Sequence, residues 1–155
     1  MIQRVQTLYL LLAAVLMSLT LFFPLATIVT GSDEVIVKTF SISGTLGLDT
    51  PLPLYMGIVL AVATLLPFVT IFLFKKRLTQ IRLCVSEIVL LLGSAAFVAL
   101  YCYRLCALLS EVVTNVVFTL GFAALMPVVA IIPVVLAIRG IAKDEALVRS
   151  LDRIR

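Results

Sequence analysis

The end of the chain decides how its fold is interpreted. The uncharged stretch VVAIIPVVLAI (residues 128–138) runs directly into RGIAKDEALVRSLDRIR (residues 139–155), which holds eight of the twenty charged residues. An apolar segment followed by a basic one is the pattern of a transmembrane helix that ends at a headgroup surface. Because Leu147, Leu151 and Ile154 keep a helical spacing, we also predict a short amphipathic helix over residues 139–155.

The composition of the whole chain agrees with this interpretation. Of 155 residues, 63% are apolar and 13% are charged, whereas about a quarter are charged in soluble domains. We therefore predict an integral membrane protein with a single membrane domain over residues 1–155. The net charge of +4 does not indicate nucleic acid binding, because the basic residues gather at the ends of apolar runs rather than on one surface.

Four apolar runs approach the roughly 20 residues that a helix needs to cross a bilayer. We predict an all-α membrane protein with four transmembrane helices at residues 8–29, 54–74, 83–109 and 116–138. The third run contains Glu87 and Arg104, each close enough to an end to reach the interface.

The basic residues predict the orientation of these helices. Lys38 is the one basic residue in the predicted outer loops, at residues 30–53 and 110–115. The excess of Lys and Arg on the other side predicts that both termini lie in the cytoplasm. The ten residues on that side are Arg4, Lys75, Lys76, Arg77, Arg82, Arg139, Lys143, Arg149, Arg153 and Arg155.

The outer loop at residues 30–53 contains EVIVKTFSI (residues 34–42) followed by turn-forming SGTLG. This composition predicts a strand or a small hairpin. The strand is apolar on both faces and therefore needs cover. It is either a cap over the protein's own helices or a docking edge for a periplasmic or membrane partner.

Glu87 is the one acid inside a predicted span, and acids within membrane helices are candidate functional residues. Arg82 lies five residues earlier, and the Lys75–Lys76–Arg77 cluster precedes it. One interpretation is an ion pair with these residues at the membrane interface. The alternative is a proton or cation site, for which the other spans supply few polar groups.

Arg104 and the tail are the other candidate interaction sites. Tyr101 and Tyr103 lie beside Arg104, which is typical of a headgroup belt, and Glu111 is spaced for an ion pair with it. In the tail, Glu145 and Arg149 form a favourable i,i+4 pair. The tail either lies on the lipid surface or binds a protein partner. Its candidate contact residues are Leu147, Arg149, Leu151 and Ile154.

The residues give no support to catalysis, a cofactor or a metal. The chain has no His, which is the commonest metal ligand and general base. Cys84, Cys102 and Cys106 are interpreted as small buried hydrophobes. Ser86 and Glu87 are adjacent, and adjacent helix residues do not face each other. We therefore predict a non-enzymatic protein with no small-molecule substrate.

Three stretches resemble a known family. MIQRVQTLYLLLAAVL at the start, LFFPLA at residues 21–26 and AIRGIAKDEALVRSLDRIR at the end are similar to an uncharacterised family of four-span inner-membrane proteins from Bacteroidota, classified only as a domain of unknown function. The resemblance extends over essentially the whole chain. It implies four helices and a bacterial inner-membrane location, and it brings no catalytic residue, cofactor or substrate.

Together these features favour an accessory subunit of an inner-membrane protein complex, with protein translocation or insertion machinery, or envelope biogenesis machinery, as candidate hosts. The expected partners are membrane lipids and larger integral membrane proteins. The alternative is a small oligomeric transporter or ion-coupled carrier that uses Glu87.

Overall fold

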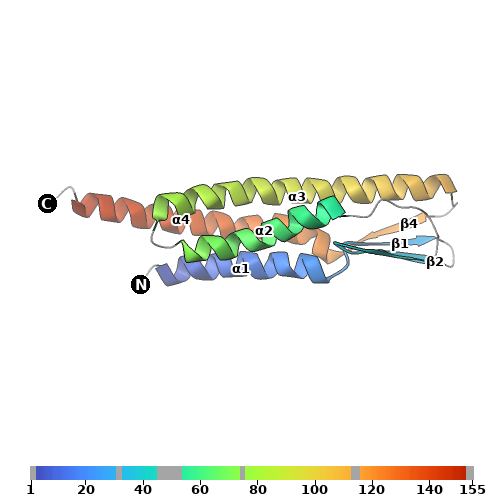
Figure 1. The fold of residues 1–155 in the computed structure, drawn as a ribbon, viewed down its shortest axis with the longest axis horizontal. Coiled ribbons are helices and arrows are strands. Elements are labelled where there is room, and N and C mark those ends of the chain that lie inside the picture. Colours follow the sequence, from blue (N-terminus) through green and yellow to red (C-terminus); the bar gives the residue numbers. More distant parts are fainter. Residues whose placement is uncertain (1–2, 31–32, 45–53, 74–75, 113–115, 153–155) are drawn as a thin grey trace.

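The computed structural model describes residues 3–30, 33–44, 54–73, 76–112 and 116–152. These residues form four long helices and a four-stranded antiparallel sheet (Figure 1). The elements in chain order are α1 (Gln3–Phe22), β1 (Ala26–Thr30), β2 (Asp33–Val37), β3 (Ile42–Ser43), α2 (Leu54–Phe72), α3 (Arg77–Val112), β4 (Val116–Leu120), the 3-10 helix η1 (Phe122–Leu125) and α4 (Met126–Asp152).

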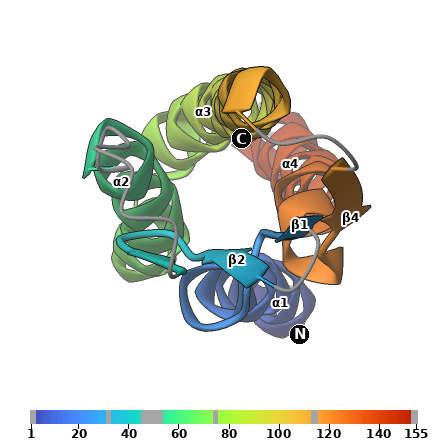
Figure 2. The same cartoon turned by 90° about the vertical axis from the view of Figure 1, so that its right-hand side faces the viewer.

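The four helices form a ring in which α1 packs on α2, α2 on α3, α3 on α4 and α4 on α1 (Figure 2). All four are long and apolar enough to cross a membrane. The start of α1 and the end of α4 lie at one end of the bundle, which we call the terminal end (Figure 1). The sheet lies at the opposite end, which we call the sheet end. The prediction of a mostly helical protein with four helices able to cross a membrane is confirmed, but the sheet is larger than predicted.

The predicted first span, residues 8–29, is wrong in its last seven residues. Helix α1 ends at Phe22, and Ala26–Thr30 is strand β1. Pro24 has no backbone N–H and cannot continue the helix, and the following ATIVT is rich in β-branched residues that favour a strand. Counting apolar residues does not separate such a strand from the last turns of a helix.

The predicted fourth span, residues 116–138, fails at its start for the same reason. Its first residues, VVFTL, form strand β4. After Gly121 and the short helix η1, α4 begins at Met126 with Pro127 in its first turn, a position where the missing N–H costs little. The two mistaken stretches pair with each other, since Ile28 of β1 lies opposite Phe118 of β4.

The sheet has the strand order β3-β2-β1-β4. Helix α3 has 36 residues, about 54 Å of helix, and Figure 1 shows it running past the other helices and along the sheet. Ile28, Val35 and Val37 of the sheet are buried in the same core as Leu105 and Leu109 of α3. The strand predicted within residues 34–42 is therefore confirmed in β2, and the buried face of the sheet packs against the protein's own core.

The predicted separate tail helix is also wrong in form. Helix α4 runs without interruption from Met126 to Asp152, so residues 139–152 continue the fourth helix. Gly140 serves close packing rather than a bend, because a Cβ atom there would lie 3.0 Å from Cγ of Gln6 in α1. Residues 153–155 lie outside the described part of the chain.

Candidate functional site

Glu87 lies on the inner face of α3, in the middle of the bundle. The neighbouring buried residues on this face are Cys84, one turn before it, and Leu91, one turn after it. The Glu87 side chain is 0% exposed. Neither of its carboxylate oxygens accepts a hydrogen bond from a described residue.

The predicted interfacial ion pair of Glu87 is therefore wrong for the described basic residues. The side chain of Arg82 is exposed. The guanidinium of Arg77 donates instead to the backbone carbonyl of Asp144, at 3.1 Å. Lys75 lies outside the described residues. The reason is geometric, because helical spacing turns Glu87 toward the bundle interior and Arg82 away from it.

A group of buried polar contacts joins all four helices near the terminal end. The amide nitrogen of Gln6 donates to the Asp144 carboxylate at 2.7 Å, which links α1 to α4. Arg77 links α3 to α4, and the amide nitrogen of Gln80 donates to the Thr70 carbonyl at 3.3 Å, which links α3 to α2. We call Gln6, Thr70, Arg77, Gln80 and Asp144 the polar layer.

The polar layer was not predicted from the sequence. Gln6 and Asp144 lie 138 residues apart, so no local pattern joins them. A usable signal existed within α4, where Ala137, Ile141 and Asp144 recur at helical spacing and are all buried. An acid that continues an apolar stripe is a candidate for the inner face, and it requires a donor on another helix.

A second candidate feature is the free edge of β4, the outermost strand. Gly121 donates its backbone N–H to the carbonyl of Leu25 at 2.8 Å, next to the pair formed by Ala26 and Leu120. Hydrogen-bonded pairs alternate along an antiparallel ladder. The backbone groups of Val117 and Thr119 therefore point toward β1, and those of Val116, Phe118 and Leu120 point outward, where no described strand pairs with them.

Three of the five side chains of β4 are apolar and exposed. Val117 is 59% exposed, Leu120 47% and Phe118 39%. The strand carries no Lys, Glu or Pro, which are the residues that commonly protect an edge from pairing. By contrast, the strand at the other edge, β3, has two residues. The docking edge that the sequence suggested in residues 34–42 thus has a longer counterpart in β4, a segment predicted to be helical.

Arg104 lies on the outer face of α3, where its side chain is exposed. Glu111 is exposed as well, and across the described ranges no ion pair joins the two residues. Gly93, eleven residues before Arg104 on the same helix, also faces outward, since a Cβ atom there would meet nothing within 4 Å. Arg104 and Glu87 therefore lie on different faces of one helix, the first exposed and the second buried.

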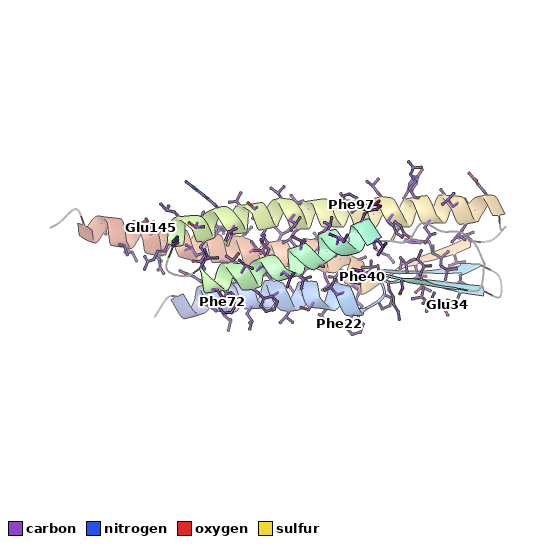
Figure 3. All side chains as sticks on the ribbon, viewed as in Figure 1. Phe22, Glu34, Phe40, Phe72, Phe97 and Glu145 are labelled. Atoms are coloured by element: carbon purple, nitrogen blue, oxygen red, sulfur yellow. The ribbon has the colours of Figure 1, made fainter. Side chains whose placement is uncertain are left out.

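The tail residues lie on the last turns of α4. Leu147 is 48% exposed, and the side chains of Arg149 and Leu151, like the whole of Ile154, fall outside the described part. An open groove of about 430 Å³ lies between the start of α3 and these turns, near Glu145 in Figure 3. It is lined by Lys76, Arg77, Leu78, Thr79, Glu145 and Val148.

The cysteines do not form a reactive or metal-binding group. Cys84 and Cys102 are buried and Cys106 is partly buried, and all three are free thiols. The described residues contain no group of three or more His, Cys, Asp or Glu side chains that could hold a metal ion. Within the described part of the interior, the group without a hydrogen-bond partner is the carboxyl of Glu87.

Comparison with known proteins places this architecture in a family. No curated protein matches the chain. A family model described as a domain of unknown function, DUF4293, matches residues 2–154. This match covers nearly the whole chain and agrees with the family class that its terminal stretches resemble. The protein, with its four apolar helices and small sheet, belongs to the DUF4293 family.

Proposed function

We propose that the protein is a non-enzymatic accessory subunit of a bacterial inner-membrane complex, and that the free edge of β4 is where it binds its partner. In this proposal the terminal end lies in the cytoplasm and the sheet lies on the outer side. The orientation is supported by the basic residues that flank the helices at the terminal end, which are Lys76, Arg77, Arg82, Arg139 and Lys143.

The observation that carries the proposal is the combination of an unpaired edge with uncovered apolar side chains. An exposed edge presents a row of N–H and C=O groups that pair readily with another extended chain. Val116, Phe118 and Leu120 offer these groups. Val117, 59% exposed, adds apolar surface on the opposite face of the strand. A partner strand would satisfy the backbone and cover apolar side chains at the same time.

The orientation in the membrane favours a different protein over a second copy as the partner. Figure 1 shows β4 running along the length of the bundle. Two copies inserted in the same direction would present parallel strands to each other, which pair slightly less stably than antiparallel ones. An extended segment of a larger membrane protein, running in the opposite direction, would extend the antiparallel sheet. Protein translocation or insertion machinery and envelope biogenesis machinery remain the candidate hosts.

Affinity purification after mild detergent extraction tests this function with two variants of one residue. Phe118→Pro removes an outward N–H while leaving the backbone groups of Val117 and Thr119 available to β1. Phe118→Ala shortens the side chain and keeps the N–H. We expect the original protein and Phe118→Ala to recover a stoichiometric partner and Phe118→Pro to lose most of it. A lone monomer in several detergents, or full recovery with Phe118→Pro, would contradict the proposal.

A second function, a small oligomeric transporter or ion-coupled carrier, is favoured by one specific observation. Glu87 is a buried acid whose oxygens have no hydrogen bond from a described residue, and such acids mark ion or proton pathways in membrane proteins. If the protein is a carrier, Glu87→Gln abolishes its transport phenotype while the bundle still assembles. An unchanged phenotype in a strain that depends on the protein would discard this alternative.

A further inference from the structure

The two buried acids of the described bundle differ in what surrounds them. The Asp144 carboxylate accepts a hydrogen bond from Gln6 at 2.7 Å. Glu87 is fully buried, and both of its oxygens lack such a donor. A folded protein rarely buries a polar group without a partner, so each exception calls for a physical explanation.

The interior around Glu87 is built with small residues. The polar layer marks one height along the bundle, with one residue on each helix: Gln6 on α1, Thr70 on α2, Gln80 on α3 and Asp144 on α4. Seven residues, nearly two helical turns and about 10 Å, separate this level from Glu87. On the other three helices, the residue seven positions nearer the sheet is an alanine. These are Ala13, Ala63 and Ala137, and each is 0% exposed. Three alanines at its level leave room for the Glu87 side chain to extend into the bundle.

An ionised carboxylate cannot remain in such surroundings without compensation. Moving an unpaired charge from water into an apolar interior costs several kcal/mol or more, and buried groups avoid this by becoming neutral or by acquiring a counter-charge. Arg77, the nearest described basic group of the polar layer, is hydrogen-bonded to the Asp144 carbonyl. Since no described basic residue pairs with Glu87, we assign its counter-charge to solution, as a proton or as a metal cation.

The surrounding groups favour the proton. Alkali and alkaline-earth cations require several oxygen ligands, and the described chain gathers no group of three acidic or thiol side chains. A protonated carboxyl needs no further ligand besides an acceptor for its O–H. The backbone carbonyl of Ala63, at the same level, is such an acceptor. Pro67 lies four residues later in α2 and has no N–H, so this carbonyl lacks its usual helical donor.

We infer that Glu87 is a proton-binding site, at which the carboxylate takes one proton from water entering at the terminal end and returns it to water by the same route. The polar layer lies between Glu87 and the terminal end, and Arg77 belongs both to that layer and to the lining of the open groove. The inference does not depend on either proposed function. It assigns a chemical state to a residue, and it holds for an accessory subunit as well as for a carrier.

The titratable groups that face Glu87 are few. On its own helix α3 the nearest is the Cys84 thiol, and on α4 it is Asp144, about two turns away. The described inner faces of α1 and α2 contribute mainly polar, non-titratable side chains, namely Gln6, Thr20, Thr64 and Thr70. The one described titratable group that α1 adds there is the Tyr9 phenol, which is partly buried against the core. A pH-dependent signal from the centre of the bundle can therefore be assigned with few variants.

Infrared spectroscopy of the full-length protein in lipid nanodiscs tests the inference directly. A protonated carboxylic acid gives a carbonyl-stretch band that is separate from the carboxylate and amide bands. We expect the original protein to show this band at neutral pH, to shift it in D₂O, and to lose it reversibly at alkaline pH. Glu87→Gln should lack the band, and the matched variant Asp144→Asn should keep it.

Isotope labelling keeps the test decisive even if Glu87→Gln does not reconstitute. Glutamate labelled with ¹³C at the side-chain carboxyl should shift the band of the original protein, and labelled aspartate should not. Three outcomes would overturn the inference: no protonated carboxyl at neutral pH, a band that survives in Glu87→Gln, or a band that disappears when Na⁺ is raised at constant pH. The last outcome would indicate a cation site. Loss of partner binding in the purification experiment would leave these results unaffected.

Discussion

The two ends of the bundle are held together by different kinds of contact. At the terminal end, the side chains of Gln6, Arg77 and Gln80 reach across to other helices. At the sheet end, backbone lies directly against backbone or against a ring. Gly121 packs on the Pro24–Leu25 peptide, and Gly57 packs on Phe40, which Figure 3 shows beside α2. Side-chain contacts can adjust when a neighbouring residue is replaced, whereas close backbone contacts cannot. The sheet end should therefore tolerate substitutions less well than the terminal end.

The largest expected effect follows from this rigidity. In Gly121→Ala the new Cβ atom would overlap the Pro24 carbonyl oxygen and lie 2.9 Å from that of Leu25. Since both are backbone atoms, β1 and β4 must separate, and we expect a loss of about 3 kcal/mol in unfolding free energy. Denaturant titration in detergent, followed by circular dichroism, measures it. Gly93→Ala is the control, because its Cβ atom meets nothing within 4 Å. Equal stability of the two variants would contradict the view that the sheet end is rigid.

A smaller loss is expected at the terminal end. Asp144→Leu removes the acceptor of the buried Gln6 amide, and an orphaned buried donor costs about 2 kcal/mol. The same titration measures this change.

Pairing this substitution with Gln6→Leu sharpens the prediction. In the double variant neither polar group is left unpaired, so part of the loss is recovered. The coupling energy of the cycle should be about 1 kcal/mol, in the range of hydrogen bonds between membrane helices. Strict additivity of the two substitutions would show that the polar layer does not stabilise the bundle.

The smallest expected effect has the opposite sign and lies between the two ends. Glu87→Met replaces an unpaired buried carboxyl with an apolar side chain of similar length. Because no described residue donates to Glu87, the substitution removes at most the hydrogen bond from its protonated O–H to the Ala63 carbonyl. Burial of an apolar side chain offsets this loss, and we expect stability to be unchanged or to rise by about 1 kcal/mol. A clear loss of stability, comparable to that of Asp144→Leu, would mean that Glu87 has a partner in the folded protein.

The sequence predicts the long helices well because a charge-free run of sufficient length is a strong signal. This prediction fails where an apolar run contains a strand beside the helix. ATIVT and VVFTL are as apolar as the helices they adjoin, and they become strands only because β1 and β4 find each other across 86 residues of chain, from Thr30 to Val116. Pro24 and the β-branched residues were the available local signals.

The candidate site can likewise be predicted only in part from the sequence. The position of Glu87 within a span could be read from the sequence, but its inward direction and its lack of a donor depend on how four helices are arranged. The polar layer could not be predicted for a related reason, since Gln6 and Asp144 are brought together by the packing of α1 on α4. Long-range partners of this kind are invisible to helical spacing alone.

Helix α3 carries Gln80, Glu87 and Leu105 on one uninterrupted rod, Arg77–Val112. If α3 rotated about its long axis, Glu87 would turn toward water. In the same movement Gln80 would shift within the polar layer, and Leu105 would shift within the core near the sheet. Because no break interrupts α3 between Arg77 and Val112, such a rotation at one end would be transmitted directly to the other end.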